Sequence, residues 1–253
     1  MGVPLDSQLI SLIIHDLRNP LNAIGMALHM IEGELSGACE DLRQDVAMIA
    51  DSARSLRKML KVLSDYNSVL VNEAPAGSLT FDPRRLVAEA VTDLTESPEA
   101  GYSARIHLEV SGTAPAAVEL DPTRARLALG HALANAVEAA GDAEVRVTVE
   151  GPPGHWVTRI ASEQPPPELV QGGPLSAERP LRLLGNAMER RGLELTIVAI
   201  VSQRFGGTAT LEVEPGLRST LVLDWPTRPA PTGDGESRSP ARLGIEPAST
   251  LRV

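Results

Sequence analysis

Two heptad patterns near the start of the chain limit its fold more than any other feature. Apolar residues recur there at alternating spacings of four and three, the repeat of helices that pack along a shared seam. Ser36 and Gly37 separate the two seams, so we expect two long helices joined by a short connection. The first seam comprises Ile10, Ile14, Leu17, Leu21, Ile24, Leu28, Ile31 and Leu35, and the second comprises Leu42, Val46, Ile49, Ala53, Leu56, Leu60 and Leu63.

A single helical hairpin of this kind cannot cover both of its apolar stripes. Two hairpins from two copies of the chain would bury those stripes in a four-helix bundle. We therefore expect a homodimer in which residues 1–72 form the dimerisation hairpin.

After residue 72 the pattern changes from heptads to short strands and helices. Pro75 and Gly77 interrupt the chain, so residues 73–81 are predicted to form a linker. The Asp-Pro pairs at 82–83 and 121–122 are typical helix starts, because Asp caps the free amides and Pro fits the first helical position. The predicted elements are helices over 82–94, 121–140 and 193–205, strands over 105–110, 117–120, 144–149, 156–161, 208–214 and 219–225, and irregular structure over 162–192.

Helices packed on one mixed sheet make an α/β sandwich. The predicted fold class is therefore α+β, with the helical hairpin followed by a sandwich domain over residues 82–226. From 227 to 253 the chain is rich in Pro, Gly, Ser and charge, a composition typical of a disordered tail.

The composition excludes several kinds of partner. A net charge of −10 argues against binding to nucleic acid or to an anionic membrane. No apolar run approaches the ~20 residues of a membrane helix, and a single cysteine fits a reducing compartment. We expect a soluble cytoplasmic protein with no sensor domain upstream on this chain, because only 14 residues precede His15. Aromatics make up only 2%, so the core should consist of Leu, Val, Ile and Ala.

His15 is the candidate chemical centre of the predicted hairpin. It follows Ile14 of the seam and so lies about 100° around the helix, at the border of the core. A half-exposed imidazole with a pKa near neutrality offers a nucleophilic nitrogen to a partner protein. Asp16 can orient the ring or accept its proton, and Asn19 lies one turn further on. Pro20 removes a helical hydrogen bond, so we expect a bend after the histidine.

The stretch HDLRNPL, which contains these residues, resembles the phosphoacceptor box of two-component histidine kinases at every position. The resemblance implies that His15 is the phosphoacceptor and that Asp16 is its acid/base partner. It also implies that Asn19 is the amide of the family's phosphatase motif. The predicted hairpin is similar to the dimerisation and phosphotransfer domain of the same family.

Residues 121–140 resemble the helix that carries the asparagine box of the family's ATP-binding domain. Such domains have the Bergerat (GHKL) fold. The resemblance implies that Asn135 bridges magnesium and the phosphates of a bound nucleotide. His131 departs from the pattern, which has an amide at this position.

The glycine-rich nucleotide motifs of the family are eroded in this chain. Where the family has an Asp-x-Gly-x-Gly loop, the sequence runs from Ser162 to Pro166 without a glycine. In the second glycine box Gly192 is retained, whereas Glu194 replaces a glycine and would repel phosphate. The sequence therefore predicts a degenerate ATP-binding domain. Should Mg-ATP bind, Asn135 and Gly192 would contact it, and Asn135 would be the magnesium ligand. A separate metal site made of histidines is not expected, because no pair of histidines has metal-ligand spacing.

Three functions are consistent with these residues. The leading hypothesis is a phosphorelay protein, similar to histidine phosphotransferases, in which His15 accepts a phosphoryl group and passes it to the aspartate of a response-regulator receiver, with an upstream kinase as a further partner. The second is an ATP-dependent histidine autokinase with a divergent nucleotide site. The third is a non-catalytic dimeric scaffold that binds a response regulator or a kinase. Nucleotide binding is the observation that separates the first two.

Overall fold

The computed structural model describes part of the chain: residues 17, 21–22, 24–26, 28, 31, 40–71, 77–96, 105–162, 172–176, 186–214 and 218–227. His15, Asp16 and Asn19, the connection between the two predicted helices, and residues 228–253 of the predicted tail lie outside the described residues. The labelled elements are α2 (Glu40–Val71), β1 (Leu79–Phe81), α3 (Pro83–Glu96), β2 (Arg105–Val110), β3 (Val118–Leu120), α4 (Pro122–Ala140), β4 (Glu144–Glu150), β5 (His155–Ser162), β6 (Gly173–Pro174), α5 (Asn186–Arg204), β7 (Thr208–Glu214) and β8 (Arg218–Pro226).

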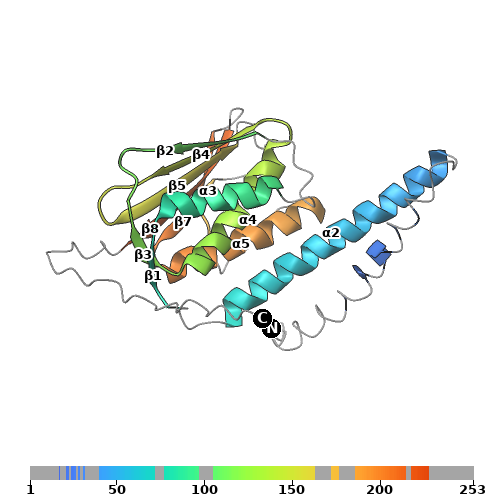
Figure 1. Cartoon of the computed structure of the whole chain (residues 1–253), viewed down its shortest axis with the longest axis horizontal. Helices are drawn as coiled ribbons and strands as arrows, with labels where there is room; N and C mark the ends of the chain where they lie inside the picture. The colour runs from blue at the N-terminus through green and yellow to red at the C-terminus, as the bar shows by residue number, and fades with distance from the viewer. Residues whose placement is uncertain are drawn as a thin grey trace, which may run out of the picture.

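A six-stranded sheet forms one layer of the α/β part of the molecule. Its strand order is β2-β4-β5-β8-β7-β6, and only the β2–β4 pair is parallel. Helices α3, α4 and α5 cover one face of this sheet (Figure 1). The alternation predicted for β4 is present, since Val145, Val147 and Val149 are buried while the residues between them point to the other face. The α+β fold class is confirmed.

The core of the sandwich is aliphatic except for one row of aromatic rings. Trp156 and Trp225, which pair across β5 and β8, are almost fully buried and meet edge to face with their ring centroids 4.9 Å apart. Phe81 and Phe205 continue the row on either side. The indole Nε1 of Trp225 donates a hydrogen bond of 2.9 Å to Ser202 Oγ in α5. The few aromatics are therefore concentrated where α5 and β1 pack on the sheet.

Three short elements differ from the sequence prediction. Residues 79–81, which were expected in the linker, form β1 and pair antiparallel with β3. The stretch 162–192, expected to be irregular, contains β6 and the first turns of α5, which begins at Asn186 instead of 193. Glycine in a helix interior costs about 1 kcal/mol, so local preference alone does not place Gly192 inside a helix.

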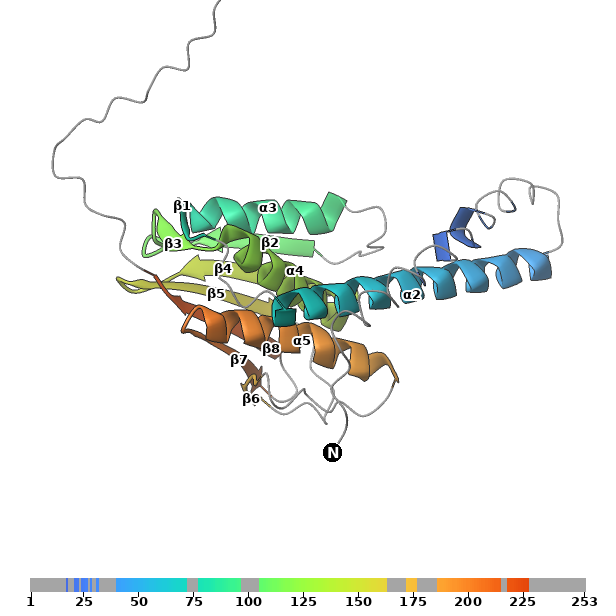
Figure 2. The same cartoon turned by 90° about the horizontal axis from the view of Figure 1, so that it is seen from below.

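Helix α2 has two apolar faces that pack against different partners. Val46, Ala50 and Leu60 form one buried cluster with Leu21 and Leu28 of the first seam. Further along the same helix, Val62 and Val69 belong to the core of the α/β part. Figure 2 shows the consequence, since the C-terminal half of α2 lies along the helical layer while its N-terminal half projects beyond it.

Several residues of the predicted seams remain exposed in the single chain. Ile49 and Leu56 of α2 are 51% and 49% exposed, and Leu17, Ile24 and Ile31 of the first seam are 43–47% exposed. Apolar side chains in this number along a heptad pattern indicate a face that the single chain does not cover. Within the described residues, no helix is both long and apolar enough to cross a membrane.

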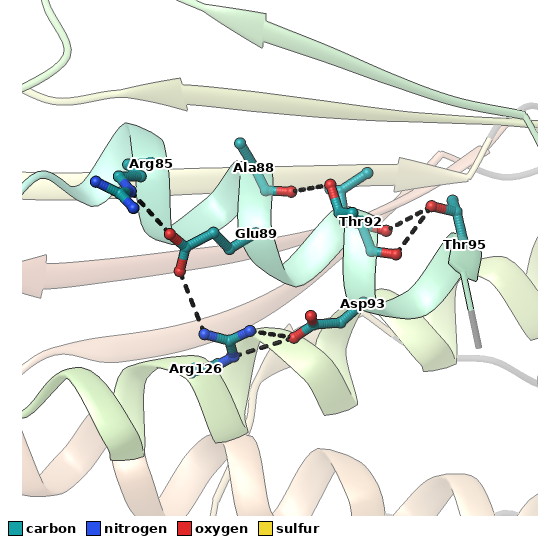
Figure 3. A network of polar contacts seen from close by, with 8 residues as sticks. Arg85, Ala88, Glu89, Thr92, Asp93, Thr95 and Arg126 are labelled. Carbon is teal, nitrogen blue, oxygen red and sulfur yellow. Dashed lines mark hydrogen bonds and ion pairs between the residues drawn. The ribbon is translucent and has the colours of Figure 1, made fainter. Parts of the chain in front are cut away.

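A polar network fixes α3 against α4 (Figure 3). The guanidinium of Arg126 in α4 binds the carboxylate of Asp93 and, at 3.2 Å, that of Glu89, which also accepts a hydrogen bond of 2.8 Å from Arg85. The hydrogen bonds that the guanidinium of Arg126 donates to Asp93 raise the pKa of Arg126 above its usual value. These groups are largely exposed, so the network orients the helices more than it stabilises them.

The N-terminal cap of α4 generates a stability prediction. The carboxylate of Asp121 is almost fully buried and accepts hydrogen bonds of 2.9 and 3.1 Å from the amides of Thr123 and Arg124. We expect Asp121→Ala to lower the free energy of unfolding by about 1–2 kcal/mol, because two amides of the first turn lose their acceptor. Urea titration measures the change. The control is Glu109→Ala on the exposed edge strand, for which a loss below about 0.5 kcal/mol is expected.

Candidate functional site

The predicted phosphoacceptor region is described only in part. Leu17 and Leu21 of the box, and Asn22 directly after it, are helical, and Leu21 packs into the cluster with α2. His15, Asp16 and Asn19 themselves lie outside the described residues. The candidate site that can be built from geometry is therefore the one around α4 and α5.

Asn135 lies in the fourth turn of α4, on the side of the helix that does not face the sheet core. Its neighbours Ala132, Leu133 and Ala136 are buried in that core, whereas Asn135 is only half-buried. Even so, the amide Nδ2 is buried and has no hydrogen-bond partner within the described part of the chain. A buried donor left unsatisfied costs about 1–3 kcal/mol. A water molecule or a ligand that offers an acceptor would satisfy this amide.

Two polar pairs connect α4 to α2 on either side of Asn135. The ring Nε2 of His131 lies 3.0 Å from Asp65 Oδ2, and the histidine side chain is only 8% exposed. Lys58 forms an ion pair with Glu138. The lower-numbered residue of α2 pairs with the higher-numbered residue of α4, so the two helices run antiparallel.

The geometry of α4 places Asn135 on the same face as these two pairs. At 100° per residue, His131, Asn135 and Glu138 fall within an arc of about 60°, and the two outer residues are about 10 Å apart along the axis. We call these three residues the α4 stripe. Val62 of α2, which lies between Lys58 and Asp65, is buried in the shared core. The two pairs thus bring α2 to the stripe that carries Asn135, while most of the packing of α2 is against α5.

Helix α5 does not present Gly192 as the resemblance would require. A phosphate cradle needs free backbone amides at a helix start, and only the first four amides of a helix lack partners. Because α5 begins at Asn186, Gly192 is the seventh residue and lies inside the helix. Within this conformation its amide is committed to the helical hydrogen-bond ladder.

Glu194, which replaces a glycine of the family pattern, is one of the most buried charged residues. It is 2% exposed, and its Oε2 atom has no hydrogen-bond partner among the described residues. A carboxylate in this setting disfavours a second anion nearby. The residues of the nucleotide site thus fit Mg-ATP poorly in this conformation: the α4 amide faces α2, and α5 offers an interior amide and an acid.

Two further parts of a nucleotide site are the adenine-binding loop and a cluster of metal ligands. Residues 163–171, where the family has its adenine-binding loop, lie outside the described residues. Among the residues that are described, no group of three or more His, Cys, Asp or Glu side chains could hold a metal ion.

The sequence interpretation missed the contact between α2 and α4. His131 was noted only as a departure from the family pattern, and Asp65 and Lys58 were not singled out. A signal was present, because Lys58 and Asp65 have the same spacing of seven residues as His131 and Glu138, with the charges in complementary order for antiparallel helices. Such a match has value only once the two helices are known to be neighbours.

Two family models match the chain. The model of the "His Kinase A (phospho-acceptor) domain" matches residues 6–69, and the model "Histidine kinase-, DNA gyrase B-, and HSP90-like ATPase" matches residues 120–229. The first range includes the predicted phosphoacceptor box, and the second includes Asn135 and Gly192.

Full-length relatives and solved structures agree with these matches. Sensor protein TorS of Escherichia coli (strain K12) is 24% identical over 230 residues, which are 88% of this chain and 24% of TorS. Two-component system protein A of Emericella nidulans is 24% identical over 145 residues, 57% of this chain and 21% of that protein. The chain thus spans about a quarter or less of the length of these relatives.

The folds of two solved structures are similar to that of this chain. Full-length ShkA in complex with AMPPNP gives a TM-score of 0.65 at 19% identity, over 90% of this chain and 48% of ShkA. The Acinetobacter baumannii histidine kinase AdeS gives 0.52 at 16% identity, over 84% of this chain and 98% of that chain. At these identities the likeness concerns the fold. Together with the two matched domain models, it shows that this chain belongs to the two-component histidine kinase family.

Proposed function

We propose that the protein is a phosphorelay component in which His15 accepts a phosphoryl group and transfers it to an aspartate of a response-regulator receiver. The observation that supports the proposal is the match of the phosphoacceptor-domain model to residues 6–69, a range that contains the stretch HDLRNPL, in which His15 would be the phosphoacceptor. Residues 1–72 are the proposed phosphotransfer region, 73–78 the part of the expected linker that precedes β1, and 79–226 the proposed nucleotide-domain relative.

The proposed transfer needs few groups from this chain. A neutral imidazole nitrogen of His15 attacks the phosphorus of an aspartyl phosphate, the bond from phosphorus to the carboxylate oxygen breaks, and the carboxylate leaves with the electron pair. The reverse step regenerates the imidazole and the aspartyl phosphate on a second receiver. Rates of such transfers depend mainly on positioning and on neutralising charge, to which the receiver's magnesium contributes.

Asp16 and Asn19 are the proposed auxiliary residues. Asp16 would orient the imidazole and take its proton, which keeps the attacking nitrogen neutral. Asn19 would position a water molecule for the hydrolysis of the receiver's aspartyl phosphate. Both roles follow from the family pattern that the sequence matches.

A second copy of the chain is the proposed partner for the uncovered apolar face. Ile49 and Leu56 of α2, together with three seam residues of the first helix, are about half exposed in the single chain. A four-helix bundle formed by two hairpins would bury them along the heptad pattern. A cytoplasmic location and an upstream kinase as phosphoryl donor complete this proposal.

An ATP-dependent autokinase is the second candidate function. It is favoured by Asn135 and by the matched ATPase model, and the related ShkA structure contains AMPPNP. The buried Glu194, the interior position of Gly192 and the contact between α2 and the α4 stripe favour the transferase, because each of them opposes nucleotide binding. A dimeric scaffold without chemistry is the third candidate.

His15→Gln tests the proposed phosphoacceptor. The purified protein is mixed with a receiver that carries a radiolabelled aspartyl phosphate, and the label on the protein is followed by gel electrophoresis. We expect acid-labile label on the wild type and a loss of at least about 10³-fold in the variant, because no other group can replace the nucleophile. The matched control is His29→Gln, which removes another histidine of the same segment and should keep the label.

Wild-type protein that stays unlabelled with every receiver tested, under conditions in which a known histidine phosphotransferase is labelled, would contradict the transferase. If His15→Gln still supports the signalling output, the scaffold is favoured instead.

Nucleotide binding separates the transferase from the autokinase. We expect the wild type to bind a fluorescent ATP analogue with magnesium no tighter than about 1 mM, since each good phosphate contact is worth only a few kcal/mol and several are missing. Fluorescence anisotropy gives the dissociation constant. Micromolar binding that Asn135→Ala abolishes, accompanied by labelling of His15 from ATP, would establish the autokinase.

A further inference from the structure

Strand β2 lies at an edge of the sheet, and within the described part of the chain no strand pairs with its outer side. It is the first strand in the sheet order, so β4 is its neighbour on one side only (Figure 1). Ile106 and Leu108 are partly buried against the core, whereas Val110 is 49% exposed. The polar residues between them point to the face away from the helices. Such an edge is a template for a further strand.

Alternate residues of β2 direct their backbone groups to the outer side. The amide of Ser111 donates a hydrogen bond of 2.9 Å to the carbonyl of Val149 in β4. In a strand the N–H and C=O of one residue point to the same side, and those of the next residue point to the opposite side. The odd-numbered residues of β2 therefore bond to β4. The backbone groups of Ile106, Leu108 and Val110 point outward, where an added strand could pair with them.

We propose that residues 241–246 of this chain, which lie outside the described residues, add to β2 as an antiparallel strand. The stretch reads ARLGIE and alternates apolar and polar positions. Pro240 and Pro247 bound it, and proline ends a ladder because it has no amide to donate. The stretch is therefore six residues long, the same length as β2. The rest of 227–253 keeps the composition expected for a disordered tail.

The apolar residues of the two segments match in one antiparallel register. In this register the apolar residues of 241–246 extend the side of the sheet that packs against the helices, and they stand beside the half-exposed end of β2. The same positions of β2 have outward backbone groups, so each pair can exchange two hydrogen bonds. The pairs are Ala241 with Val110, Leu243 with Leu108 and Ile245 with Ile106.

The charged residues match in the same register. Arg242 comes opposite Glu109, and Glu246 comes opposite Arg105, on the face away from the helices. Opposite charges directly across two strands stabilise the pairing. A shift of two residues in either direction would lose both ion pairs, and a shift of one would turn the apolar residues to the other face. Charge and hydrophobicity thus select one register.

The chain leaves the sheet at the correct end and is long enough to reach β2. Strand β2 is parallel to β4, and two antiparallel steps lead from β4 to β8, so β2 and β8 run in the same direction. A chain that turns back after β8 therefore runs antiparallel to β2. The distance from β8 to a strand beyond β2 is four strand spacings, about 19 Å. Residues 228–240 can span up to about 43 Å.

A strand from the same chain would also protect the protein. An uncovered edge with apolar residues can pair with other molecules and lead to aggregation. A tethered segment has an effective concentration of the order of millimolar, so it competes well with other copies for the edge. The inference does not depend on the phosphotransfer proposed for His15.

Hydrogen exchange at single amides, measured by NMR on the full chain, tests the added strand. We expect slow exchange at the outward amides of Ile106, Leu108 and Val110 in the wild type. The amides of His107 and Glu109, which point to β4, are the internal reference, because they should be slow with or without the added strand.

Leu243→Pro removes an amide and an apolar side chain at the centre of the proposed strand. It should speed exchange at the three outward amides by at least about tenfold and leave the reference amides slow. The matched control is Leu251→Pro, the same substitution in the same tail, which should change none of the five amides. Both positions follow β8 in the chain, outside the sandwich.

A charge exchange tests the register. Glu246→Arg places two cations opposite each other and should speed exchange at the outward amides, although less than Leu243→Pro does. Combining Glu246→Arg with Arg105→Glu restores an ion pair of opposite direction and should restore slow exchange. Rapid exchange in the double variant, equal to that of Glu246→Arg alone, would contradict the register.

Two results would overturn the inference: rapid exchange at the outward amides of the wild type, or slow exchange that persists in Leu243→Pro. A third experiment identifies the chain that supplies the strand. Isotope-labelled wild type is mixed with an excess of unlabelled Leu243→Pro, and the two are refolded together. Slow exchange on the labelled chain supports its own tail as the strand, whereas rapid exchange would assign the strand to another copy and reject the proposal.

Discussion

The burial of two opposite faces of α2 is the constraint on which the rest of the arrangement depends. One face packs with the first seam and the other enters the core of the α/β sandwich, so a single rigid helix belongs to both parts of the molecule. A helix of 32 residues is about 48 Å long and transmits a rotation at one end to the other. Leu21 of the predicted phosphoacceptor box and the core of the sandwich therefore pack against the same helix.

Most of the sandwich could be predicted because its signals are local. The helix over 121–140 has a capping aspartate, a proline at its first position and a glycine after its end, and α4 spans these limits. The alternating strands β2, β4 and β5 were recognisable for the same reason. Strand β1 and the start of α5 were not, because three residues carry too little pattern and because Gly192 opposes a helix locally.

For the candidate site, the sequence identified the residues but not their surroundings. Asn135 and Gly192 could be named from spacing, and the substitution of Glu194 was evident in the sequence. What spacing could not reveal is accessibility: that Glu194 is buried, that Gly192 is inside a helix, and that α2 reaches the stripe that carries the amide. These properties arise from contacts between segments about 70 residues apart, such as Asp65 and His131, and no local rule specifies them.

The row of aromatic rings has a consequence for spectroscopy. The two tryptophans lie 4.9 Å apart in the core of the sandwich, so tryptophan fluorescence reports on that core, whereas far-ultraviolet circular dichroism also records the 32 residues of α2. The same sample thus contains two separate optical probes of one chain. Denaturation curves that coincide by both probes would identify α2 and the sandwich as a single cooperative unit, and curves that separate would make the helix a unit of its own.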